Sequence, residues 1–107
     1  MSKQPDPRIV AAKLAEVEDE MKRMGLWQRD SLRPEQYEFR QAFAMDTMAF
    51  SQWLQFIFIP RVKEIIAAGG QFPSESQVGA QAIREFDSWP DAEKLLGLLS
   101  EFDALFG

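Results

Sequence analysis

Near the N-terminus, apolar residues are spaced as on one face of a helix. They recur at alternating steps of four and three positions: Val10, Leu14, Val17, Met21 and Met24. This spacing predicts an amphipathic helix that packs along a single stripe. Asp6 can cap its start, Pro7 suits the first helical position and Gly25 suits a left-handed stop. We expect the stripe to face the protein's own bundle. A coiled-coil dimer is the alternative, although the stripe spans fewer than three heptads.

The opposite face of this helix is polar and is expected to face solvent. Its charged residues are Lys13, Glu16, Asp19, Glu20 and Arg23. Asp19 and Arg23 carry opposite charges four positions apart, a spacing that favours an ion pair. Glu16 and Glu20 share that spacing, but carboxylates on a solvated face are not expected to acquire the shifted pKa values that acid–base chemistry needs.

Residues 26–49 form a long connector that is too apolar for a floppy loop. Its large apolar residues are Leu26, Trp27, Leu32, Tyr37, Phe39 and Phe43. Pro34 can begin a single helical turn within it. We expect the connector to wrap the bundle with its aromatic side chains inserted.

The most apolar stretch of the chain predicts a second helix over residues 50–68. Its first half has almost no polar face, so the helix should lie at the centre of the fold with several neighbours. Gly69 and Gly70 suit its end. Pro60 is expected to bend it, because the proline ring displaces the hydrogen bond to the Phe56 carbonyl.

Two shorter helices complete the pattern. The third is predicted over residues 75–86, with a capping box formed by Ser74 and Gln77. Its inward face comprises Val78, Ala82, Ile83 and Phe86. The fourth opens at residues 88–91, and its core side comprises Leu95, Leu98, Leu99, Phe102, Leu105 and Phe106. Residues 1–107 are therefore predicted to form a single all-α domain, a four-helix bundle with a long structured connector between helices one and two.

The composition excludes several kinds of chemistry. The chain has no cysteine and no histidine, so disulfides and thiolate nucleophiles are excluded and the commonest general base and metal ligand are missing. We predict no cofactor, no metal site and no enzyme activity of the chain alone. The N-terminus lacks the apolar core of a signal peptide, and no apolar run is long enough to cross a membrane, which favours a cytoplasmic protein without membrane contact.

The net charge of −5 lies entirely in the last third of the chain. Residues 1–73 carry ten basic and ten acidic side chains, whereas residues 74–107 carry two basic and seven acidic ones. Such a surface repels phosphate backbones and disfavours direct nucleic-acid binding. It is compatible with an electropositive protein partner, although a solubilising face is the simpler interpretation.

Three groups of residues resemble the YqcC-like family of small bacterial proteins. They are Phe43-Ala44-Met45-Asp46-Thr47-Met48, Trp53-Leu54-Gln55 and Ile59-Pro60-Arg61, followed by the ending Leu99-x-x-Phe102-Asp103-Ala104-Leu105-Phe106. The resemblance covers nearly the whole chain and implies a compact all-α bundle. Phe50 departs from it, because a proline there would mark the helix start more clearly. Members have no established activity. Some are encoded beside a tRNA pseudouridine synthase, which suggests a link to RNA modification.

Asp46 and Arg61 are candidate binding residues. A carboxylate at position 46 could be a perturbed acid that anchors a ligand, or it could accept backbone N–H bonds and fix the connector. The Arg61 guanidinium could offer a bidentate fork to a carboxylate or phosphate. Its structural alternative is a contact with the freed Phe56 carbonyl or with an acidic residue of the fourth helix.

Met45, Met48 and Trp53 complete the candidate site, as the lining of a small-ligand pocket under the connector with Asp46 at its edge. The alternative is that these side chains fill the core. The same choice applies to all three tryptophans, since an exposed pair would mark a protein-binding surface instead.

Three function hypotheses follow. The first is a non-enzymatic accessory module, a monomer or weak dimer that docks onto a protein such as an RNA-modifying enzyme. The second is the small-ligand pocket. The third is direct RNA binding through basic residues interleaved with aromatics, chiefly Arg33 and Arg40, although the acidic residues among them make this interpretation the weaker one.

Overall fold

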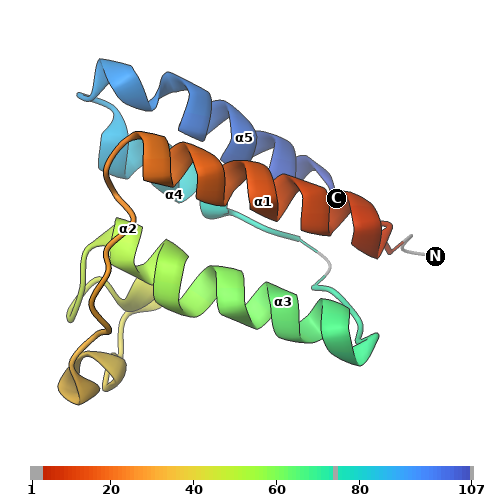
Figure 1. The fold of residues 1–107 in the computed structure, drawn as a ribbon, viewed down its shortest axis with the longest axis horizontal. Coiled ribbons are helices and arrows are strands. Elements are labelled where there is room, and N and C mark those ends of the chain that lie inside the picture. The colour runs from red at the N-terminus through yellow and green to blue at the C-terminus, as the bar shows by residue number, and fades with distance from the viewer. Residues whose placement is uncertain (1–3, 74, 107) are drawn as a thin grey trace.

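The computed structural model describes residues 4–73 and 75–106, and within them every regular element is helical. The principal helices are α1 (Pro7–Arg23), α2 (Phe50–Trp53), α3 (Ile59–Ala68), α4 (Val78–Phe86) and α5 (Glu93–Ala104). Helices α2 and α3 are two parts of one continuous helix, so the predicted four-helix bundle is confirmed. In Figure 1, α1 runs between α5 and α3, and α5 also packs on α4.

Helix α1 begins and ends as its sequence predicts. The Asp6 carboxylate accepts a hydrogen bond from the Arg8 backbone N–H at 2.9 Å, and Gly25 adopts the left-handed conformation with φ +75°. Four residues of the apolar stripe are buried, namely Val10, Leu14, Val17 and Met21. Because these side chains lie in the protein's own core, the stripe is not available for a coiled-coil dimer.

The predicted polar face of α1 needs two corrections. Glu20 is buried rather than solvated, and Arg23 pairs with Glu20 instead of Asp19. The reason is tertiary: the segment that leads into α5 places Asp91 against the guanidinium of Arg23, which draws that side chain toward α5 and over Glu20.

The predicted helix over residues 50–68 has the expected bounds, and Gly69 ends it with φ +64°. Its irregularity near Pro60 takes the form of a π-helical segment, Leu54–Phe58, rather than a simple proline bend. The Ile59 N–H bonds the Leu54 carbonyl five residues back. Pro60 has no N–H to give, and the wider π turn accommodates its ring within a continuous helix.

The connector packs mainly on the central helix, through the 3₁₀ turns Pro34–Tyr37 and Ala42–Ala44, with Trp27, Phe39 and Phe43 partly buried. It covers a small second core made of Leu32, Ala44, Met48 and Ile57. Tyr37 is the exception, because its side chain is 48% exposed instead of inserted. The tyrosine hydroxyl makes that position on a surface turn tolerable.

Helix α4 begins at Val78, three residues later than predicted. Its cap is not local: the Asp103 carboxylate on α5 accepts hydrogen bonds from the Val78 and Gly79 backbone N–H groups, at 3.0 and 2.8 Å. The Ser76 hydroxyl donates to the same carboxylate at 2.6 Å. The predicted capping box involves Ser74, which lies outside the described residues.

Gly79 permits the close approach of α4 to α5. A Cβ atom at that position would lie 2.8 Å from the Ser100 backbone and 2.9 Å from Asp103 Oδ2. Ile83, predicted to face inward, is 50% exposed, because the inward arc of this short helix is already filled by Val78, Ala82 and Phe86.

Helix α5 follows a 3₁₀ turn at Pro90–Ala92, which begins within residues 88–91, where the fourth helix was predicted to open. Five apolar residues of its core side are buried, and Leu105 packs against them partly buried; the five are Leu95, Leu98, Leu99, Phe102 and Phe106. None of the helices in the described part of the chain has the length and apolar character to cross a membrane.

Candidate interaction site

The structure places Asp46 on the surface, where its carboxylate folds the connector. It accepts hydrogen bonds from the backbone N–H groups of Arg40 and Gln41, at 3.0 and 3.4 Å. These bonds, the Arg40 one foremost, hold the pKa of Asp46 below its ordinary value, because they stabilise the charged form. Both oxygens are therefore engaged by the protein's own backbone.

The loop that Asp46 closes contains an unusual backbone. Phe43 and Ala44 both adopt positive φ, +57° and +53°, a conformation that costs free energy for residues other than glycine. The Phe43 ring packs edge-on against Trp53, with 5.0 Å between ring centroids. This contact and the Asp46 hydrogen bonds hold the loop in place. Asp46 thus has the geometry of a connector-fixing residue.

The other predicted site residues are dispersed. Met48 lies in the second core. Trp53 is partly buried and packs against both the second core and the larger core between the helices. Met45 is 52% exposed, and its sulfur accepts a hydrogen bond from the Gln81 side-chain amide at 3.7 Å. Arg61 is exposed on α3. Within residues 4–73 and 75–106, its side chain forms neither a hydrogen bond to the Phe56 carbonyl nor an ion pair with α5, the two contacts named as its structural alternative.

The tryptophans divide between core and surface. Trp53 stacks on Phe50 and Phe58. Trp27 is partly buried, with the Lys22 ammonium 5.4 Å from its ring centroid, a favourable cation–π geometry. Trp89 is 37% exposed and contacts Phe86 edge-on. They do not form an exposed pair.

An apolar groove lies between α1 and α3, away from the connector. It encloses about 360 Å³, which is within the range of sites that bind small molecules or partner side chains. Its apolar lining consists of Ala11, Leu14, Ala15, Ile66 and Ala67. Ala11, Ala15 and Ala67 are exposed, so their small side chains leave both helix backbones open to close approach.

One end of this groove carries charge. Glu18 accepts a hydrogen bond from the Lys22 ammonium at 2.8 Å and lies 3.5 Å from the Lys63 ammonium of α3. The Lys22 hydrogen bond is the main reason why the pKa of Glu18 is below its ordinary value. Asp19 lines the groove beside this pair. The groove is therefore apolar along α1 and polar where α1 approaches its C-terminus.

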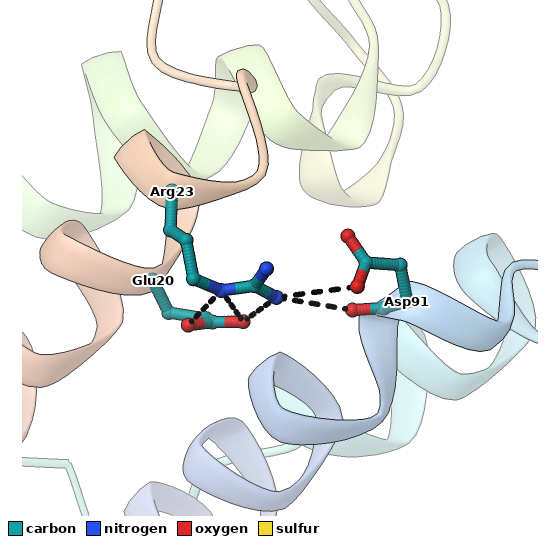
Figure 2. Close-up of polar contacts among 3 residues, drawn as sticks. All are labelled: Glu20, Arg23 and Asp91. Carbon is teal, nitrogen blue, oxygen red and sulfur yellow. Dashed lines mark hydrogen bonds and ion pairs between the residues drawn. The ribbon is translucent and has the colours of Figure 1, made fainter.

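A second cluster lies on the other side of α1, where Arg23 bridges two acidic residues (Figure 2). Its Nε atom lies 2.9 and 3.0 Å from the Glu20 carboxylate oxygens, and its Nη2 atom lies 3.5 Å from Asp91. The Glu20 side chain is only 2% exposed. The hydrogen bonds from Arg23 lower the pKa of Glu20, so the buried carboxylate is held in its charged form.

Sequence reasoning missed both the groove and this cluster. The spacing of Glu20 and Arg23, three positions apart, was the available indication for the ion pair. The indication for the groove was weaker. Ala11, Ala15 and Ala67 are small residues flanking the apolar stripes of two helices, but nothing in the sequence shows that those helices pack side by side.

Comparison with known proteins agrees with this fold. The sequence matches the model of the DUF446 family, described as tRNA pseudouridine synthase C, over residues 9–105. It is 31% identical over 86 residues to the uncharacterized protein YqcC of Escherichia coli K12, which covers 75% of this chain and 74% of that protein. An uncharacterized protein of Haemophilus influenzae Rd is 29% identical over 77 residues, 69% and 73% of the two chains.

The solution NMR structure of YqcC from E. coli superposes with a TM-score of 0.83 at 28% identity. The match covers 94% of this chain and 86% of the other. The predicted resemblance to YqcC-like proteins is therefore confirmed. The two similar bacterial proteins carry no functional description.

Proposed function

Because this chain belongs to the DUF446 family and shares the fold of YqcC, we propose that it is a non-enzymatic accessory protein that docks onto another protein. The observation that carries the proposal is the apolar groove between α1 and α3. Exposed apolar surface that is hollowed and rimmed by charge is typical of protein-binding sites. The absence of histidine and cysteine from the sequence also makes catalysis by this chain alone the weaker hypothesis.

The shape of the groove suits a partner that presents a helix better than one that presents a flat surface. The α1 residues that line it run from Ala11 to Asp19, which corresponds to about 12 Å, or two helical turns. Alanine side chains on both walls permit a third helix to approach the backbones of α1 and α3, and the apolar residues of that helix would fill the hollow.

An RNA-modifying enzyme is the partner class that we propose for the test. The description of the family contains the name of a tRNA pseudouridine synthase, and this supports a partner of that class. Docking to the enzyme would connect the chain to RNA modification without requiring it to bind RNA through its own acidic surface.

The test is a calorimetric titration of the purified chain with the tRNA pseudouridine synthase C of the same organism. Ala15→Arg places a long cation in the groove, and because Ala15 is exposed on a helix, the variant should fold normally. Ala80→Arg, an exposed position on α4, is the matched control.

We expect Ala15→Arg to weaken binding at least tenfold, which is on the order of what one central interface position can contribute, and Ala80→Arg to bind like the unmodified chain. Equal binding by both variants would refute the groove as the docking site. No binding by the unmodified chain would refute this enzyme as the partner.

A further inference from the structure

The apolar groove is followed by two further hollows around the outer side of α1, each sharing lining residues with the one before it. Asp19 lines both the apolar groove and a hollow of about 280 Å³ on the outer side of the helix. Arg23 and Lys94 line that hollow and also a third one, of about 610 Å³, between the end of α1 and α5. A single bound segment that lay across these shared residues could therefore contact all three hollows.

The two outer hollows are strongly acidic. Their lining contains six carboxylates, from Glu16, Asp19, Glu20, Asp91, Glu93 and Glu101. Two cations, Arg23 and Lys94, line the same hollows, and Lys13 pairs with Glu16 and Glu101, which leaves a net charge of −3. Arg23 is already bonded to Glu20 and Asp91, as Figure 2 shows. The excess negative charge therefore belongs to the carboxylates that face solvent.

Asp19 stands where the apolar and acidic parts meet. It forms none of the ion pairs found among residues 4–73 and 75–106, and it is exposed. Its neighbour Glu18, by contrast, is held between Lys22 and Lys63. Asp19 is thus the acidic residue beside the apolar groove that remains available to a cation from outside.

The acidic side also has room for a long side chain. Gly97 lines the hollow of about 610 Å³, and no atom lies within 4 Å of the position that a Cβ atom would take there. An arginine or lysine side chain could lie across this open helix surface with its charged end among the carboxylates.

We infer that the docking partner contributes an amphipathic helix whose apolar face fills the α1–α3 groove and whose flank toward α5 carries lysine or arginine. This inference rests on the proposed docking function and specifies the chemistry of the partner. Complementary charge at the edge of an apolar contact selects the partner and its orientation. A helix with an acidic flank would meet the exposed carboxylates of Asp19 and Glu93 with like charge.

Two synthetic peptides of 18 residues would serve as probes. Both have the same face of leucines when helical, and their remaining positions are all lysine in one peptide and all glutamate in the other. Binding to the full chain is measured by isothermal titration at low and physiological salt. The protein variants are Asp19→Lys, its matched control Asp87→Lys at an exposed position after α4, and the groove variant Ala15→Arg.

We expect the lysine peptide to bind and the glutamate peptide not to bind. Asp19→Lys should weaken the lysine peptide about fivefold or more at low salt, with a smaller effect at higher salt, and Asp87→Lys should change it less than twofold. Equal binding of the two peptides, or equal effects of the two charge reversals, would overturn the inference. If the charge inference failed in this way but Ala15→Arg abolished peptide binding, the groove would remain the docking site. If Ala15→Arg also left peptide binding unchanged, the groove would be excluded as the docking site as well.

Discussion

Removal of the Asp103 carboxylate tests the non-local cap on α4. This side chain accepts three hydrogen bonds, from the Ser76 hydroxyl and from the backbone N–H groups of Val78 and Gly79. Asp103→Ala removes an N-cap, which costs about 1 kcal/mol. Gly79 is buried, so its N–H would lose its partner out of reach of water, at a further cost of about 1–2 kcal/mol. We therefore expect a loss of about 2–3 kcal/mol in the free energy of unfolding.

The assay is urea unfolding at pH 7, followed by helical circular dichroism and by tryptophan fluorescence. Glu101→Ala is the control, because Glu101 lies on the same helix but pairs with Lys13 while its own side chain is 61% exposed. Such a pair contributes about 0.5 kcal/mol. If the Asp103 and Glu101 variants lost the same free energy, the tertiary cap would not stabilise α4 as the structure indicates.

Three further perturbations test other parts of the structure. Gly79→Ala should lose about 2 kcal/mol in urea unfolding, because the new Cβ would lie 2.8 Å from the Ser100 backbone; an unchanged midpoint would contradict the close approach. Asp46→Asn should lower the melting temperature and leave groove binding unchanged, since its carboxylate accepts backbone hydrogen bonds; the reverse result would restore Asp46 as a binding residue. Arg23→Met should lower the melting temperature at pH 7 more than at pH 3. The folded-state pKa of Glu20 lies below its ordinary value of 4.5. The stabilisation from the Glu20–Arg23 ion pair is therefore complete above pH 4.5 and is lost as the pH falls through the folded-state pKa. If the melting-temperature difference between Arg23→Met and the unmodified chain grew on acidification, this prediction would be contradicted.

The sequence predicted the elements whose determinants are local. The start and end of α1 depend on Asp6, Pro7 and Gly25 within the helix itself, and the central helix over residues 50–68 follows from its apolar character and from Gly69. Residues next to one another in the chain set these features, so the one-dimensional pattern contains them.

The features that the sequence did not predict depend on contacts between distant segments. The start of α4 is fixed by Asp103, about 25 residues later, and Glu20 is buried because the turn before α5 lies against Arg23. The groove exists because α1 and α3 lie side by side with small, exposed alanines on both of its walls. A residue that is polar by type can be buried by a neighbour that the local pattern does not reveal.

Native mass spectrometry of the chain, tagged at its own locus and purified gently, tests the docking function most directly. The unmodified protein and Ala80→Arg are predicted to carry the additional mass of one protein partner, and Ala15→Arg is predicted to carry none. A bare chain in all three samples, or the same partner retained by Ala15→Arg, would contradict the assignment of the α1–α3 groove as the docking site.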